Sequence, residues 1–314
     1  MPLMEEIRAI LPHVGARLQA DVVMATRSTF QIGGPADILF EPANATEIEQ
    51  IAAYCFEKGV PLTVLGNGSN VLVSDRGIRG VVLVIGDEMS EMTFIGTQIV
   101  ADAGIRLSTL AGAAARQGLS GLEFASGIPG TLGGAILMNA GAYGQCMADV
   151  VVLTEFLDEQ LVHRSLVGAE HGFGYRCSAF SDRSAIILRA CLKLQQDDPQ
   201  AIFARIADLS LRRRASQPLD MPSAGSTFKR PEGHFAGKLI SDCGLKGCRI
   251  GNAQVSEKHA GFIINLGLGC AADTRSLIEK IKREVAEKTG IHLEPEVRFV
   301  GEWQEWGQDG PAKE

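Results

Sequence analysis

The chain has 314 residues, a formal net charge of −7 and 46% hydrophobic residues, enough for a sizeable core in two or three domains. The acidic balance argues against nucleic acid as a partner. The seven cysteines are scattered and no C-x-x-C occurs, so we expect neither a disulfide framework nor a metal site.

The start of the chain, MPLMEEIRAI, is acidic and lacks the basic and then apolar order of a signal peptide. The uncharged stretch 124–148 is long enough to suggest a membrane span, but several glycines, Pro129, Asn139 and Gln145 interrupt its apolar residues. We therefore expect a cytoplasmic protein with reduced thiols and no contact with a membrane.

Helices and strands alternate along the chain. Thr46 and Glu49 form a capping-box pattern that predicts a helix ending at Gly59, and further helices are predicted at 107–117, 199–214 and 274–288. Short β-branched segments predict strands at 37–40, 62–65, 81–85, 98–101, 150–156, 185–194 and 261–265. This order indicates a mixed α and β class.

The stretch 126–144, SGIPGTLGGAILMNAGAYG, holds six glycines and no charged residue. Glycine lacks a Cβ and adopts positive φ angles, so successive backbone N–H groups can converge on phosphate oxygens. The stretch therefore predicts a cradle for the diphosphate of a large cofactor. A Gly-rich bend between core strands is the simpler alternative.

A second Gly-rich turn, GNGSN at 66–70, directly follows the strand predicted at 62–65. A small-residue loop at a strand end favours phosphate binding, although such a loop is also typical of a tight hairpin. The residues at 71–73 continue as extended chain, whereas the dinucleotide-binding pattern opens a helix at this point. The Rossmann fold is therefore disfavoured.

Taken together, the two loops resemble the flavin-binding domain of the vanillyl-alcohol-oxidase (PCMH) type. Further motifs narrow the resemblance to the UDP-N-acetylenolpyruvoylglucosamine reductase (MurB) family: TFQIGGPAD at 29–37, AGSTFKRP at 224–231, GKLISDCGLKG at 237–247, AQVSEKHAGFIIN at 253–265 and LEPEVRF at 293–299. The resemblance covers roughly residues 20–301. It implies an α+β fold with a PCMH-type domain in two subdomains and a smaller α+β substrate-binding domain.

The resemblance also implies the domain limits. The FAD-binding domain would span 20–200, with its two subdomains divided near residue 87, and the substrate-binding domain would span 201–301. Residues 291–301 would return to the first subdomain, and 302–314 would form a polar tail.

The activity implied by the resemblance is reduction of the enolpyruvyl group of UDP-N-acetylglucosamine enolpyruvate to UDP-N-acetylmuramate, with hydride passed from NADPH through FAD. Asn67, Ser69 and Asn70 stand in the loop where several relatives of this fold carry a His bonded to flavin, so we expect non-covalent FAD. The residues expected to contact FAD are Gly33, Gly34, Gly66, Asn67, Gly68, Ser69, Asn70, Ser126, Gly127, Ile128, Pro129, Gly130, Gly133, Gly134, Asn139, Gly141 and Ala142.

Three residues match the catalytic positions of the family. Arg176 would bind and polarise the substrate carboxylate, Ser226 would donate a proton to carbon, and Glu296 would assist at the carboxylate, as an acid or by ordering its neighbours. In another context these residue types would be a surface ion-pair partner, a turn residue and a solvated side chain. The residues expected to bind the substrate are Tyr175, Lys229, Lys238, His259 and Arg298.

Charge is uneven along the chain. The segment 225–262 holds six bases and three acids, and six minus three gives a local +3 that would focus an anionic substrate. A solvated surface of mixed charge is the alternative. The arginines at 212–214 are expected to stabilise a helix C-terminus, with a smaller chance of ligand contact.

The strand predicted at 185–194 follows soon after Arg176, which leaves no room for the insertion that carries a tyrosine lid in some members. The chain thus resembles the lidless type II subtype, and we expect a monomer. Two other hypotheses stay open at this point: another FAD-dependent oxidoreductase of the same fold, and a non-catalytic protein that binds a nucleotide sugar.

Overall fold

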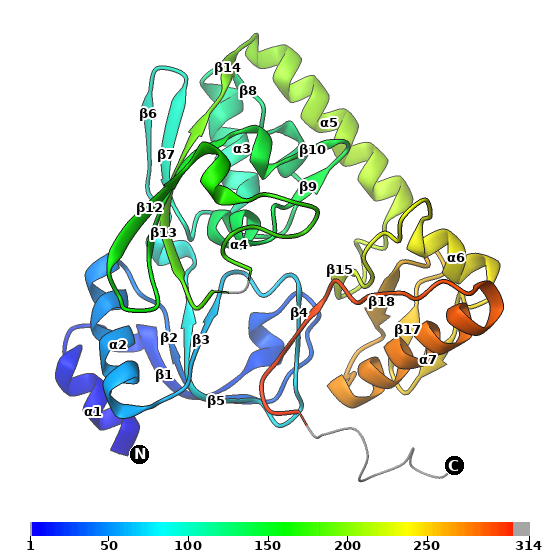
Figure 1. Cartoon of the computed structure of the whole chain (residues 1–314), viewed down its shortest axis with the longest axis horizontal. Helices are drawn as coiled ribbons and strands as arrows, with labels where there is room; N and C mark the ends of the chain where they lie inside the picture. The colour runs from blue at the N-terminus through cyan, green and yellow to red at the C-terminus, as the bar shows by residue number, and fades with distance from the viewer. Residues whose placement is uncertain (1, 182, 304–314) are drawn as a thin grey trace.

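The structure, a computed structural model, describes residues 2–181 and 183–303. Two sheets with their helices form the larger part, and a third sheet with two helices forms a separate lobe (Figure 1). The predicted polar tail lies outside the described residues from 304 onward. Within the described ranges, no helix is both long and apolar enough to cross a membrane.

The first sheet has the strand order β1-β2-β5-β3. Strand β5 pairs in parallel with both β2 and β3, whereas β1 is antiparallel to β2. Val81, Val82 and Leu83 of β5 are fully buried, as expected for a central strand covered on both faces. The elements of this part are α1 (Pro2–Ile10), β1 (Leu18–Val23), β2 (Pro35–Phe40), α2 (Ala45–Lys58), β3 (Leu62–Leu65) and β5 (Ile78–Val84).

Helix α2 begins earlier than the capping-box pattern at Thr46 predicts, so that prediction was wrong. Asn44 is the N-cap, because its side chain accepts a hydrogen bond of 2.9 Å from the N–H of Glu47. Asparagine caps a helix at least as well as threonine. Gly59 ends the helix in the left-handed conformation, with φ 65°, as predicted.

The second sheet is antiparallel throughout, with the order β12-β11-β13-β7-β6. Buried residues of both sheets form one core, which includes Phe40 and Leu83 of the first sheet and Ile99 and Leu192 of the second. The elements of this part are β6 (Met92–Ile95), β7 (Gln98–Asp102), α3 (Leu107–Arg116), β8 (Leu119–Ser120), α4 (Leu132–Leu137), β9 (Gly141–Ala142), β10 (Gln145–Cys146), β11 (Val151–Leu157), β12 (His163–Val167), β13 (Ile186–Lys193) and β14 (Gln195–Gln196).

Helix α5 (Pro199–Ser216) runs from the second sheet to the C-terminal lobe (Figure 1). The lobe contains an antiparallel sheet of order β15-β18-β17-β16 with α6 and α7, and Leu277 and Ile281 of α7 are fully buried in its core. Its elements are β15 (Ser223–Ser226), α6 (Ala236–Asp242), β16 (Arg249–Ile250), β17 (Ala253–Val255), β18 (Phe262–Asn265) and α7 (Ala271–Thr289).

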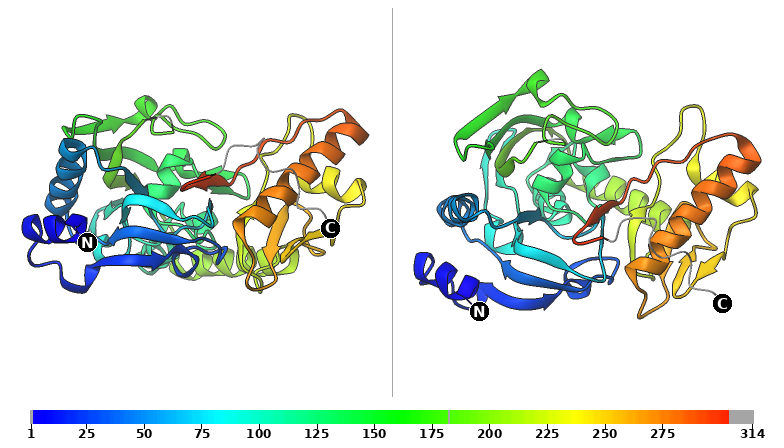
Figure 2. Two further views of the ribbon diagram at one scale, coloured as in Figure 1. Left: turned by 90° about the horizontal axis from the view of Figure 1, so that it is seen from below. Right: turned by 60° about the horizontal axis from the view of Figure 1, so that its bottom comes forward.

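The chain then leaves the lobe and returns to the larger part. Strand β19 (Arg298–Val300) pairs in parallel with β4 (Val71–Val73), which directly follows the first Gly-rich loop. Both views of Figure 2 show this last strand lying among the elements of the N-terminal half. The pairing excludes a hairpin at that loop, because β3 pairs with β5 and β4 pairs with β19.

Side chains also fix the lobe against the N-terminal half. The carboxylate of Asp75 accepts hydrogen bonds from the N–H groups of Ala271 and Ala272 at the start of α7. The buried side chain of Asn265 donates to the carbonyl oxygens of Phe30 and Gln31. These contacts set the position of the lobe, while the domain limit at 200/201 remains a prediction.

The strands predicted from the sequence all occur, with ends shifted by a residue or a few. The predicted helix at 107–117 ends at Arg116, and the last predicted helix, at 274–288, extends over Ala271–Thr289. Short elements were not predicted, among them α4, α6, β15 and β17. Their length leaves too few residues for a visible hydrophobic period.

A buried carboxylate joins α5 to the start of the second Gly-rich stretch. Glu123 is 6% exposed and accepts hydrogen bonds from Ser120 Oγ, the N–H of Gly121 and the guanidinium of Arg205. Burial alone raises the pKa of Glu123, but the Gly121 N–H and Arg205 more than offset it, so the pKa lies below its ordinary value. The ionised carboxylate therefore stabilises the fold.

We expect Glu123→Gln to lower the free energy of unfolding at pH 7 by about 1–3 kcal/mol, because a charged acceptor of several donors is lost. A carboxylate with a depressed folded-state pKa stabilises the protein above its unfolded pKa and loses this effect as pH falls through the folded value. The difference between the proteins should thus shrink in acid. Urea unfolding of the parent protein and the variant, at pH 7 and at acid pH, measures this difference in the free energy of unfolding. Glu57→Gln on the exposed side of α2 is the control. A difference that persists undiminished in acid would contradict the assignment.

Candidate active site

A cavity of about 740 Å³ lies where the first sheet, the second sheet and the C-terminal lobe meet. This volume is typical of sites for small molecules, which hold about 300–1,000 Å³. Several parts of the chain line it, among them the loop after β3, the segment around α4, and residues of β15 and β19. The predicted site residues that line it are Gly66, Asn67, Gly68, Ser69, Asn70, Ile128, Pro129, Gly130, Gly134, Gly141, Ala142, Arg176, Ser226, Glu296 and Arg298.

The loop after β3 can approach its neighbours because Gly66 and Gly68 have no β-carbon. A Cβ on Gly66 would lie 2.2 Å from Thr131 Oγ1, and one on Gly68, where φ is 59°, would lie 2.4 Å from the carbonyl oxygen of Arg27. The side chain of Asn67 donates a hydrogen bond of 2.6 Å to the carbonyl of Pro129. The two Gly-rich loops are therefore in direct contact.

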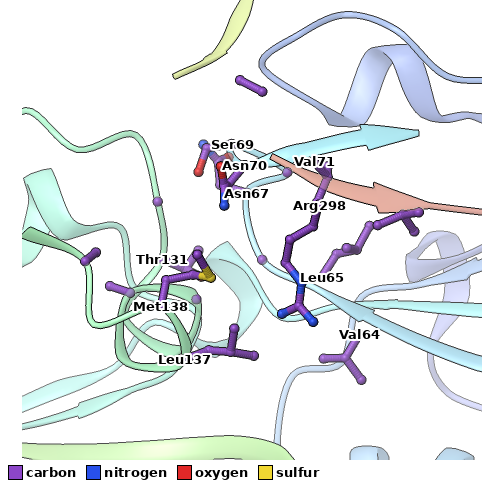
Figure 3. Close-up of a pocket in the computed structure, with 18 of the residues that line it drawn as sticks. Val64, Leu65, Asn67, Ser69, Asn70, Val71, Thr131, Leu137, Met138 and Arg298 are labelled. Atoms are coloured by element: carbon purple, nitrogen blue, oxygen red, sulfur yellow. The ribbon is translucent and has the colours of Figure 1, made fainter. Parts of the chain in front are cut away.

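Figure 3 shows the same arrangement from within the pocket. Asn67, Ser69 and Asn70 lie on one side, and Thr131, Leu137 and Met138 of the segment around α4 lie on the other. Arg298 extends from β19 toward Leu65 and Val64, at some distance from the loop residues. Its place in this view is at the end of β3, rather than beside the polar loop residues.

Some residues predicted to contact FAD do not line this cavity. Gly33 and Gly34 pack tightly against β4, since a Cβ would lie 2.7 Å from Val73 Cβ and 2.0 Å from the carbonyl oxygen of Asp75, respectively. Gly133 donates a backbone hydrogen bond of 2.8 Å to Ala103. Ser126 and Gly127 line an adjoining hollow of about 440 Å³, and Asn139 is 7% exposed.

Arg176 occupies the tight turn between Gly174 and Cys177, with an unfavourable φ of 58° for a residue with a side chain. Its Nε donates a hydrogen bond of 2.7 Å to Glu296 Oε1, and its Nη2 lies 3.4 Å from the carbonyl oxygen of Gly141. The turn and the returning C-terminal segment thus meet in one ion pair that borders the cavity.

Glu296 lies in the segment that leads from the lobe into β19. Its backbone N–H donates to the carbonyl of Thr227, and its carbonyl accepts from the side chain of Asn70. Burial raises the pKa of Glu296, and the nearby Arg176 and Lys229 offset only part of that effect. The carboxyl group thus holds its proton to higher pH than an exposed glutamate.

Ser226 ends strand β15, directly after Gly225, whose φ is 75°. It pairs in register with Phe262 of β18, and both residues line the cavity. The lobe therefore delivers a hydroxyl group to the cavity that holds Arg176 and Glu296, and all three predicted catalytic residues border the same space.

Four residues predicted to bind the substrate do not line the cavity, within the described part of the chain. Lys229 pairs with Glu294, and Lys238 pairs with Asp242 on α6. The ring of His259 packs against Gly237 and Gly261, and burial lowers its pKa. The hydroxyl of Tyr175 accepts a hydrogen bond from the N–H of Arg230.

The basic residues of 225–262, which we expected to focus an anionic substrate, do not contribute to the lining of this cavity, so that role stays a prediction. Among the described residues, none of those six bases lines the cavity; they are Lys229, Arg230, Lys238, Lys246, Arg249 and Lys258. The charged residues that do line it are four arginines and one glutamate: Arg176, Arg183, Arg213, Arg298 and Glu296. The cavity is cationic although the chain is acidic, because arginines from three separate segments of the chain converge on it.

Sequence reasoning missed several of the lining residues. Arg213, near the end of α5, packs against Gly127, and burial lowers its pKa. The Oε1 atom of Gln217 is buried and has no hydrogen-bond partner within the described part of the chain. For the arginines at 212–214 we expected mainly a helix C-terminus and gave ligand contact the smaller chance, whereas no local signal marks Arg183 or Gln217.

The cavity fits an extended anionic ligand such as a flavin dinucleotide. Two Gly-rich loops in contact can present backbone N–H groups to a diphosphate, arginines supply opposite charge, and Gln217 offers an unpaired polar atom. Apolar residues around Cys55, Phe56 and Val60 extend the cavity beyond the loops, as a ring system requires.

Comparison with known proteins agrees with this geometry. Residues 36–160 match the FAD binding domain family, and residues 217–300 match the family described as UDP-N-acetylenolpyruvoylglucosamine reductase, C-terminal domain. The chain is 47% identical over 300 residues to the UDP-N-acetylenolpyruvoylglucosamine reductase of Caldanaerobacter subterraneus subsp. tengcongensis, covering 96% of this chain and 98% of that protein. It is 43% identical over 303 residues to the enzyme of that name from Listeria welshimeri, covering 95% and 100% of the two chains.

A solved structure is similar over nearly the same length. The crystal structure of UDP-N-acetylenolpyruvylglucosamine reductase (MurB) from Thermus caldophilus matches with a TM-score of 0.78 and 36% identity, covering 90% of this chain and 99% of that chain. The match and the FAD binding domain confirm the predicted fold class, a flavin-binding domain combined with a smaller α+β domain.

We expect Gly68→Ala to destabilise the protein more than Gly144→Ala, because both glycines have left-handed φ angles but differ in surroundings. A Cβ at Gly144 meets open space and should cost only the backbone strain, about 1–2 kcal/mol. A Cβ at Gly68 would also collide with the backbone of Arg27 and should add about 1–3 kcal/mol. Urea unfolding of both variants measures the difference, and equal losses would contradict the close packing of the loop.

Proposed function

Because this chain belongs to the UDP-N-acetylenolpyruvoylglucosamine reductase family, we propose that FAD occupies the cavity and that Arg176, Ser226 and Glu296 act on the substrate beside it. The chain is an FAD-dependent oxidoreductase that reduces the enolpyruvyl group of UDP-N-acetylglucosamine enolpyruvate with NADPH, in the synthesis of peptidoglycan precursors. The observation that carries the residue assignment is their convergence, from three distant segments, on one cavity.

The two Gly-rich loops are the proposed cradle of the FAD diphosphate. The hydrogen bond from Asn67 to Pro129 and the close approach of Gly66 to Thr131 support this proposal, because they bring the loops together. No His or Cys occurs at 66–70. This supports a cofactor that is bound without a covalent bond to that loop. When bound, FAD would supply the hydride-transfer chemistry that links NADPH to the vinyl carbon of the substrate.

Arg176 is proposed to bind the carboxylate of the enolpyruvyl group. Its guanidinium is a planar donor that always carries charge, and its Nε is held by Glu296 while other N–H groups stay available at the cavity. Negative charge that develops next to the carboxylate during reduction would be stabilised by this fixed cation. We assign Glu296 the role of an acid at that carboxylate, supported by its burial and raised pKa.

Ser226 is proposed to donate the proton that completes the reduced product at carbon. Its position at the end of β15, on the face of the lobe that lines the cavity, supports this assignment. Lys229 and Lys238, which were expected to bind the substrate, each pair with a carboxylate elsewhere. The proposal therefore assigns no role to these lysines in the proton transfer.

The short connection after Arg176 supports the lidless type II subtype. Strand β13 begins at Ile186, soon after the turn that ends at Cys177. The seven cysteines are free thiols, which supports the expected cytoplasmic location.

We expect Ser226→Ala to retain FAD and its reduction by NADPH but to slow reoxidation by substrate by about 10²–10⁴-fold, because the variant lacks the proton donor. Anaerobic stopped-flow absorbance of the flavin follows the two half-reactions separately. Ser241→Ala on α6, outside the cavity, is the matched control and should behave as the parent protein does. Normal reoxidation in the Ser226 variant would refute the assignment.

We also expect the rate of the substrate half-reaction to fall as pH rises through the raised pKa of Glu296, since the protonated carboxyl is the proposed acid. Glu296→Gln should be slower below this pKa and should lose the alkaline decline that this group causes. Rates measured across the pH range for the two proteins test the proposal. If both profiles decline in the same way, Glu296 is not the titrating acid.

A further inference from the structure

Asn139 lies at the end of the segment that follows α4, and its side chain is 7% exposed. Both polar atoms of its carboxamide bind backbone groups rather than facing the cavity. Nδ2 donates a hydrogen bond of 2.9 Å to the carbonyl of Gly174, and Oδ1 accepts one of 3.0 Å from the N–H of Ala148. The side chain thus joins two segments that are distant in the sequence.

The backbone of Asn139 suits this position. Its N–H donates to the carbonyl of Ile136 at the end of α4, and its φ of 42° reverses the chain in the left-handed region. Asparagine is one of the few residues with a side chain that adopts this conformation routinely. The carboxamide therefore projects from a backbone that is itself fixed by the helix end.

The carbonyl that receives Nδ2 belongs to the turn that carries Arg176. Gly174 closes this turn by donating its N–H to the carbonyl of Cys177 at 3.0 Å. Arg176 has an unfavourable left-handed φ of 58°, so the turn requires contacts that hold it. Glu296 holds the guanidinium from the returning C-terminal segment, and Asn139 holds the backbone from the segment after α4.

The hydrogen bond from Ala148 to Asn139 also helps to fix the surroundings of Arg176. Asn139 and Ala148 flank the β9–β10 hairpin, so the bond between them closes the base of that hairpin. The hairpin begins with Gly141, whose carbonyl lies 3.4 Å from Nη2 of Arg176. One side chain therefore fixes both the turn of Arg176 and the backbone acceptor beside its guanidinium.

We propose that Asn139 is a positioning residue, which holds Arg176 in the orientation that receives the substrate carboxylate, instead of a residue that contacts FAD. The inference rests on the proposed role of Arg176. A small displacement of a binding group can cost about 10²-fold in rate. The effect of removing Asn139 should therefore appear in the step that involves the carboxylate and not in the reduction by NADPH.

Two variants separate the side chain from the backbone conformation. Asn139→Asp keeps the acceptor for Ala148 but places a carboxylate oxygen against the Gly174 carbonyl, and Asn139→Gly keeps the left-handed backbone but removes both bonds. We expect both to bind FAD and to be reduced by NADPH at the parent rate, while reoxidation by substrate slows by about 10–100-fold. Asn44→Asp, a change at a helix N-cap where either residue is suitable, is the control and should change neither step.

A double-mutant cycle with Arg176→Gln tests whether Asn139 acts on the substrate step through Arg176. If Asn139 acts through Arg176, the double variant Asn139→Asp with Arg176→Gln should be about as slow with substrate as Arg176→Gln alone. Additive losses would overturn the inference, as would loss of FAD from the Asn139 variants or an equal slowing of both half-reactions.

If Asn139→Asp does not fold, Asn139→Gly serves in the same cycle. If Arg176→Gln alone leaves the substrate step unchanged, the proposed function itself fails, a result distinct from additive losses.

Discussion

The ion pair between Arg176 and Glu296 is the interaction on which the arrangement of the site depends. Its two partners are 120 positions apart in the chain and come from a tight turn and from the returning C-terminal segment. That segment reaches the turn because β19 pairs in parallel with β4. The pair lies largely out of water, where removing one partner of an ion pair is costly, so each residue constrains the other. The same burial raises the pKa of Glu296, and a protonated carboxyl group can still accept the hydrogen bond from Arg176 Nε, so the contact is compatible with a proton donor.

Glycines make the second constraint. Gly66 lets the loop after β3 approach Thr131 of the segment around α4, and Gly68 lets the same loop approach the backbone of Arg27, because neither glycine has a Cβ. The diphosphate cradle that we propose is therefore a consequence of backbone packing. Positive charge comes separately, from four arginines on three segments, so a chain of net charge −7 presents a cationic cavity. The local field, rather than the net charge, decides which ligand the cavity favours.

Sequence reasoning was most successful where local patterns decide the structure. The strand at Leu62–Leu65 and the left-handed stop at Gly59 follow from residues within a few positions of one another. The family motifs then placed all three catalytic candidates at one cavity. The N-cap of α2 was wrong because two good capping residues compete nearby, and the choice between them depends on how the preceding chain packs.

Long-range packing decided the rest of the site, which the sequence could not show. Lys229 and Lys238 sit in motifs of the substrate domain, yet each pairs with a carboxylate away from the cavity. Arg213 was assigned to a helix end, and the path of α5 brings it to the cavity wall.

The most direct test is a crystal structure with FAD and the substrate bound. The account predicts the substrate carboxylate about 3 Å from the guanidinium of Arg176, with Ser226 Oγ facing the adjacent carbon. A carboxylate bound elsewhere, with Arg176 still paired only to Glu296, would contradict it.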